Sequence, residues 1–66
     1  MPTLAIGNLI IYKDTYAYAF EVVEKGSIGL IYEKKKTRYR VLLNNGMRSE
    51  VTSKDLEKDK IDIIAT

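Results

Sequence analysis

The chain contains neither cysteine nor histidine among its 66 residues. Without cysteine there is no disulfide framework, and without either residue type there is no Cys/His zinc site. The thiol nucleophile and the imidazole base of many enzymes are missing too. No apolar run approaches the ~18 residues that a membrane-spanning helix needs, and no secretory leader is recognisable. We therefore expect a non-catalytic, cytoplasmic (intracellular) protein with no metal, no cofactor and no membrane contact.

The length leaves room for one domain, residues 1–66. A domain of this size buries only about 60% of the surface that its unfolded chain exposes, so its stability is marginal. Its composition, 45% hydrophobic and 30% charged, is typical of a globular protein. Since disulfides and a zinc site are excluded, we expect a small closed barrel, self-association, or both.

The stretch from Ser27 to Val51 predicts a three-stranded meander around which the rest is organised. In order, the expected elements are strand 27–33, charged turn 34–37, strand 38–44, turn Asn45–Gly46 and strand 47–52. An Asn-Gly dipeptide favours a type I′ hairpin turn, in which both central residues have positive φ. The two turns would join these three strands into one antiparallel sheet.

The strand 38–44 has the clearest alternation in the chain. Tyr39, Val41 and Leu43 should face the core, whereas Arg38, Arg40 and Leu42 should face solvent or a partner. In the preceding strand, Gly29 is typical of a bulge, a sharp bend or the close approach of another backbone.

The segments before the meander are less regular. Leu9–Tyr12 is predicted to be a strand buried on both faces. Tyr16–Ala19 mixes helix-favouring and strand-favouring residues, and we expect a loop that leads into a strand over Phe20–Lys25. A hairpin turn at Gly26–Ser27 would then join that strand to the meander.

After the meander, one turn of 3₁₀ helix is expected near residues 53–56. The alternation in Ile61–Ile64 predicts a final strand, which would pair with the first strand or with a neighbouring chain. The second option predicts a homodimer formed by strand addition.

The glycines and predicted core positions of about residues 7–57 follow a characteristic spacing. The matching segments are Gly7–Ile10, Gly26–Ile31, Tyr39–Val41, Gly46, Val51 and Asp55–Glu57. This layout resembles the SH3-like small β-barrels, in particular the KOW and Tudor-like group, with Asn8 where those proteins usually have Asp. The resemblance implies an all-β, five-stranded barrel followed by a tail, 58–66, that contains the final strand. Members bind RNA, DNA, peptides or other proteins, so the resemblance names no partner.

Basic residues are concentrated in the predicted hairpin. Residues 33–48 carry six of the eleven Lys and Arg residues and a single acidic one. They are Lys34, Lys35, Lys36, Arg38, Arg40 and Arg48, with Tyr32 and Tyr39 beside them. Cations could hold phosphates while a ring stacks on a base, which predicts a nucleic-acid-binding surface. The competing interpretation is a lysine-rich turn that keeps an edge soluble.

Five tyrosines are many for so short a chain. Tyr16 and Tyr18 fall in the loop after the first strand, which often lines the binding groove in SH3-like barrels, and tyrosine is enriched at interfaces. The sequence pI of about 8.9 lies just below the value usual for nucleic-acid-binding domains. We therefore expect a protein-interaction module or a small inhibitor or accessory protein, such as a phage encodes. A nucleic-acid-binding module is the first alternative, and an oligomer that sequesters an anionic nucleotide is the second.

Overall fold

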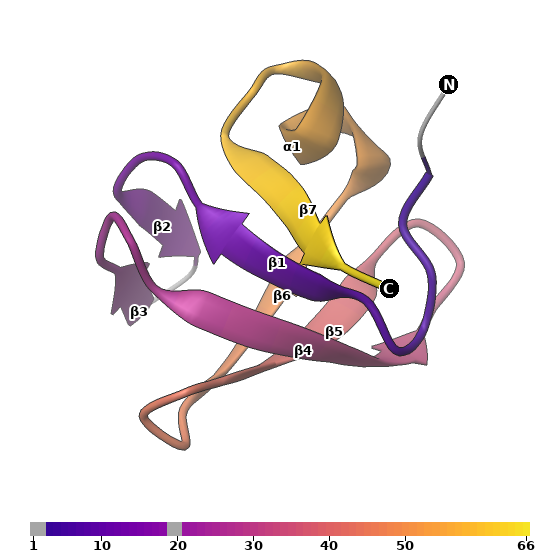
Figure 1. Cartoon of the computed structure of the whole chain (residues 1–66), viewed down its shortest axis with the longest axis horizontal. Coiled ribbons are helices and arrows are strands. Elements are labelled where there is room, and N and C mark those ends of the chain that lie inside the picture. Colours follow the sequence, from indigo (N-terminus) through magenta and orange to yellow (C-terminus); the bar gives the residue numbers. More distant parts are fainter. Residues whose placement is uncertain (1–2, 19–20) are drawn as a thin grey trace.

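The computed structural model describes residues 3–18 and 21–66. Within these residues, short segments form seven strands and one helix. The elements are β1 (Leu9–Tyr12), β2 (Tyr16–Tyr18), β3 (Glu21–Val23), β4 (Ile28–Lys34), β5 (Tyr39–Leu43), β6 (Arg48–Val51), α1 (Ser53–Glu57) and β7 (Ile61–Ala65). Figure 1 shows β1, β4, β5 and β6 crossing the molecule, with β7 beside β1. The all-β class predicted from the sequence is confirmed.

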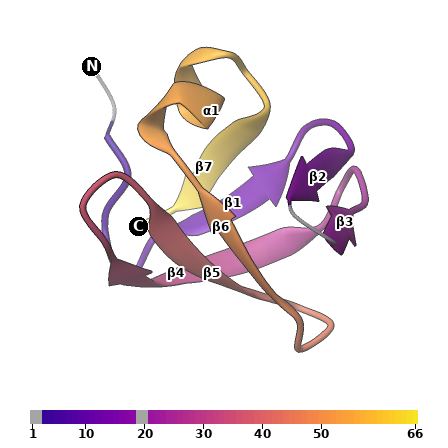
Figure 2. The same cartoon turned by 180° about the vertical axis from the view of Figure 1, so that it is seen from behind.

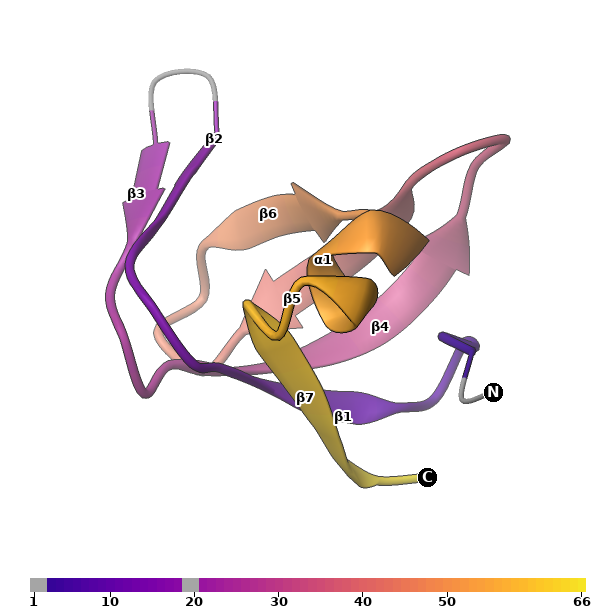
Figure 3. The same cartoon turned by 90° about the horizontal axis from the view of Figure 1, so that it is seen from above.

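Five strands form an antiparallel sheet in the order β6-β5-β4-β1-β7, while β2 and β3 form a separate two-stranded hairpin. The hairpin projects away from the curled sheet (Figure 3). Helix α1 connects the two edge strands, β6 and β7, across the open side of the sheet (Figures 2 and 3). Because these edges are bridged by the helix rather than paired, the described strands do not close into a barrel.

The core lies inside the curl of the sheet. Its buried apolar residues are Leu4, Ile10, Tyr12, Val23, Ile31, Tyr39, Val41, Leu43, Val51 and Ile61. The predicted inward positions of β5 are thus confirmed, and Arg40 and Leu42 lie on the opposite face. Burial of this kind is the main favourable contribution to folding in so small a domain.

Gly29 lies on the core face of β4, opposite Ile10 in β1 and Leu43 in β5. A Cβ atom placed there would overlap Cγ1 of Val41 and lie 3.3 Å from Cδ2 of Leu43. The glycine therefore makes room for neighbouring side chains, rather than for a backbone. The bulge that it suggested lies further along, between Ile31 and Glu33.

Three predictions for the first half of the chain are wrong. Strand β1 is not buried on both faces, because Leu9 is 36% exposed. Tyr16–Tyr18 is a strand, not a loop, and it pairs with β3. The turn at Gly26–Ser27 does not make a hairpin of β3 and β4, since the Gly26 amide donates to the Tyr12 carbonyl. Ala19 and Phe20, included in the expected loop and strand, lie outside the described residues.

Two details of the second half also differ. Of the two turn residues only Gly46 has a positive φ, 87°, and the Gly46 amide donates to the Leu43 carbonyl. The turn is therefore not type I′, and Gly46 alone supplies the left-handed residue of a longer hairpin loop. The segment 53–57 is α-helical rather than 3₁₀, with an i→i−4 bond from Lys58 N to Lys54 O.

The final strand pairs with β1 of the same chain. The Lys13 amide donates to the Lys60 carbonyl, so alternation turns the backbone groups of Ile61 and Ile63 toward the outer edge. There the Ile63 amide donates to Oδ1 of Asp62 at 2.9 Å. A side chain of β7 therefore already occupies one of the hydrogen-bonding groups of this edge.

Candidate functional site

The outer face of the sheet carries a row of leucines. In the strand register Leu9 is opposite Leu30, and Leu30 is opposite Leu42. These three side chains are 36%, 38% and 40% exposed. An antiparallel sheet with one solvated face usually places polar residues at such positions. We call Leu9, Leu30 and Leu42 the leucine row.

The row continues into a cation–aromatic pair on β6 and β4. Arg48 is opposite Leu42, and its guanidinium carbon lies 5.9 Å from the centre of the Tyr32 ring. That spacing allows a cation–π attraction. Tyr32 is half-buried, and its hydroxyl finds no hydrogen-bond partner among the described residues. Tyr32 and Arg48, both predicted site residues, are thus brought together at one end of the leucine row.

Two other predicted cations are engaged in ion pairs. Arg40 lies 3.8 Å from Oε1 of Glu33 and 3.5 Å from Oε2 of Glu50. Arg38 lies 3.7 Å from the other oxygen of Glu50. Two of the six basic residues of this hairpin are therefore paired with carboxylates of the same chain.

The lysines of the β4–β5 turn are exposed. Lys34, at the end of β4, has its Nζ 5.8 Å from the centre of the Tyr39 ring, and Lys35 and Lys36 follow in the turn. Tyr39 is only 8% exposed and belongs to the core. Its ring face is therefore largely closed to a stacking base, although the three ammonium groups remain accessible.

Tyr16 connects the β2–β3 hairpin to helix α1. Its hydroxyl donates to Oδ2 of Asp55 at 2.9 Å, and its ring packs edge-on against Tyr12 with centroids 5.7 Å apart. Asp55 also accepts from the Thr52 amide at 2.7 Å and the Thr52 hydroxyl at 3.3 Å. Tyr16 thus has a structural role, with Arg38 of the basic hairpin close enough to act on it electrostatically. The Tyr18 side chain lies outside what the structure describes.

These contacts change the titration of Tyr16. Burial raises the pKa of the Tyr16 phenol well above its ordinary value, and the bond to Asp55 adds to that increase. A raised pKa means that the unfolded chain loses this proton first, so stability is full below about pH 10 and falls as the pH rises beyond it. We expect unfolding midpoints in urea to fall above that pH, and to fall less steeply in Tyr16→Phe. An equal slope in both proteins would contradict this assignment.

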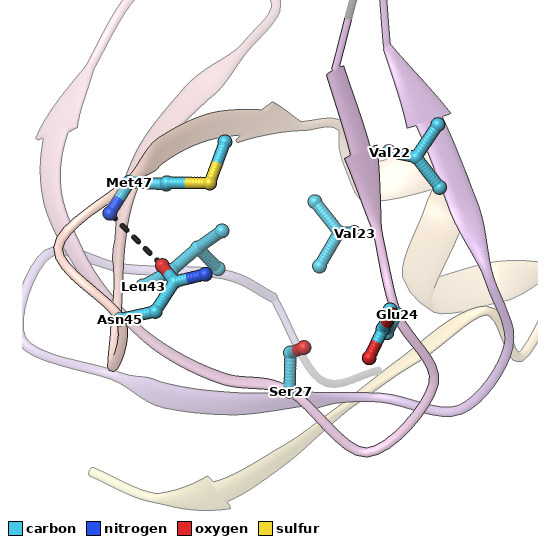
Figure 4. A pocket seen from close by; sticks show the side chains of 7 residues that line it. All are labelled: Val22, Val23, Glu24, Ser27, Leu43, Asn45 and Met47. Carbon is cyan, nitrogen blue, oxygen red and sulfur yellow. Dashed lines mark hydrogen bonds between the residues drawn. The ribbon is translucent and has the colours of Figure 1, made fainter.

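Two hollows lie beside these elements. A cleft of about 300 Å³ separates β3 from the β5–β6 turn and is lined by Val22, Val23, Glu24, Ser27, Leu43, Asn45 and Met47 (Figure 4). A shallower hollow of about 420 Å³ is lined by Thr37, Arg38, Thr52, Ser53 and Lys54. No pattern in the sequence indicated the cleft, because it depends on how the β2–β3 hairpin is placed beside the sheet.

Within the described residues, no group of three or more His, Cys, Asp or Glu side chains is arranged to hold a metal ion. The same part of the chain contains no helix with the length and apolar character needed to cross a bilayer. Comparison of the chain with protein-family models, curated proteins and solved structures gives no match.

Proposed function

We propose that the protein is a protein-interaction module of SH3-like architecture that binds its partner through the outer face of the sheet. The strand order β6-β5-β4-β1-β7 supports this architecture. So does α1, a short helix containing the Asp55–Leu56 pair, which precedes the final strand. The barrel itself would require β6 and β7 to approach more closely.

The leucine row is the observation that carries the proposal. Three leucines from three adjacent strands are each more than one-third exposed, in a domain with little apolar surface to spare. Contiguous apolar surface of this kind marks interaction sites. Tyr32 and Arg48 at its end are of the residue types that dominate binding energy at protein interfaces. The expected partner surface is apolar, with a carboxylate placed to meet Arg48.

Nucleic-acid binding is the second candidate, and the exposed Lys34, Lys35 and Lys36 favour it. The pairing of Arg38 and Arg40 with acidic residues places it second, because each ion pair would have to be broken to contact phosphate. The same pairing weakens the hypothesis of a nucleotide-sequestering oligomer, which relied on these two arginines.

The test is affinity capture with three forms of the full chain. The double variant Leu30→Ser/Leu42→Ser should weaken capture of the partner by roughly tenfold or more, because it removes two apolar contacts near the centre of the surface. The matched control, Lys35→Ser/Lys36→Ser, changes an exposed turn and should capture the same protein as the unmodified chain. Urea unfolding verifies that all three forms are folded.

The reverse pattern would contradict the proposal. If the lysine variant loses the captured material and the leucine variant retains it, the turn is the binding element. A titration with single-stranded and duplex oligonucleotides at low salt would then identify nucleic acid, since phosphate contacts are strongest there.

A further inference from the structure

The cleft between β3 and the β5–β6 turn is distinct from the leucine row. It opens between the hairpin and the end of the sheet, and Figure 4 shows Val23 and Met47 facing each other across it with Leu43 at its base. Met47 is 44% exposed, whereas Val23 and Leu43 are 3% and 5% exposed, so Met47 supplies most of the open apolar surface among these three residues. A volume of about 300 Å³ is at the lower limit for ligand pockets and suits a single side chain.

Polar groups of the cleft lie on two sides of it (Figure 4). Glu24 and Ser27 lie near each other on one side, and Asn45 lies across from them in the β5–β6 turn (Figure 4). Of the described residues that line the cleft, Glu24 alone is charged. Oδ1 of Asn45 already accepts the Met47 amide at 2.9 Å and keeps a second acceptor site. The cleft therefore offers a carboxylate and a hydroxyl on one side and an amide oxygen on the other.

We propose that this cleft binds an alkylammonium group, as presented by a lysine side chain of the partner protein. The proposal rests on the proposed function, for which the cleft supplies a second contact. The methylene chain of lysine would pack along the exposed side chain of Met47, with the buried Val23 and Leu43 beneath it, as such stems do on apolar surfaces. Its ammonium would then reach Glu24 and the neutral acceptors, because it donates in several directions.

Other ligand classes fit less well. An anionic group would meet the carboxylate of Glu24 without a cation among the described lining residues. A wholly apolar group would leave Glu24, Ser27 and Asn45 without new partners while removing water from them, which costs free energy. Met47 adds adaptability, since its unbranched thioether adjusts to the shape of an inserted chain.

The test uses small probes, so it does not depend on the partner or on the leucine row. The full chain is titrated with Nα-acetyl-lysine N-methylamide and with the norleucine analogue, which lacks the ammonium, and methyl resonances of Val23, Leu43 and Met47 are followed by NMR. We expect shifts at these methyl groups, with tighter binding of the lysine probe. Glu24→Gln should weaken that binding by roughly threefold to fivefold, as an exposed ion pair predicts.

The matched control is Glu57→Gln, which removes an exposed carboxylate on α1 outside the cleft and should leave the affinity for the lysine probe unchanged. Equal binding of the two probes, equal loss in the two variants, or the absence of shifts in the cleft methyl groups would each overturn the proposal. The Leu30→Ser/Leu42→Ser variant should still bind the lysine probe, so failure of the protein-interaction surface is seen separately.

Discussion

Replacing Gly29 with alanine will lower the free energy of unfolding by roughly 2–3 kcal/mol. The new methyl group would overlap Cγ1 of Val41, a fully buried side chain. Valine is branched at Cβ and restricted at χ1, so it cannot turn aside cheaply and β4 and β5 must separate. A domain of this length has a total stability of about 3–10 kcal/mol, so a large part of it would be lost. Urea unfolding followed by circular dichroism measures the change.

A double-mutant cycle separates overlap from other effects of the alanine. Val41→Ala removes the overlapped atom, and the pair Gly29→Ala/Val41→Ala should be more stable than the sum of the single changes predicts, by about 1 kcal/mol or more. Additive effects would show that Gly29 is required for another reason. An unchanged unfolding midpoint in Gly29→Ala alone would contradict the close approach itself.

Replacing Asp55 with alanine will cost about 3 kcal/mol, because one nearly buried carboxylate holds three hydrogen bonds. Its loss leaves the Thr52 amide without its partner at the start of α1 and releases Tyr16 from the helix. Asp55→Asn keeps one carbonyl oxygen and should retain part of the stability. Thermal and urea unfolding of the variants give the values.

Tyr16→Phe is the matched control for that change. It removes only the contact between hairpin and helix, and it should cost about 1 kcal/mol, the net value of one hydrogen bond. If Asp55→Ala costs no more than Tyr16→Phe, the bonds to Thr52 contribute nothing measurable. The helix would then depend on packing alone.

The parts of the fold that the sequence predicted are those set by local periodicity. In β5 the alternation of apolar and charged residues identified the core positions, because successive side chains of a strand point to opposite faces. The same alternation placed Leu42 toward solvent or a partner, which is where the leucine row lies. The Gly46 turn was located for a similar reason, although its type was wrong.

The parts that depend on register between distant segments could not be predicted. The bulge between Ile31 and Glu33 shifts the pairing so that Glu33 lies opposite Arg40. Counting charges without that shift predicts an open basic surface on the β4–β5 hairpin. The shift instead gives Arg40 an acidic neighbour on either side. The β2–β3 pairing was missed because Tyr16–Tyr18 favours no single conformation by composition.

The Asp62 contact on β7 has a consequence for how this chain behaves when crowded. An exposed strand edge is the template on which fibrils grow, since each incoming segment takes up the vacant amides. At Ile63 that amide is occupied from within, and the register of β7 is interrupted by an irregularity between Leu9 and Ile10 of its neighbour. A strand from another chain must displace the Asp62 carboxylate before it can pair with β7 at Ile63, so the addition of strands to this edge is hindered.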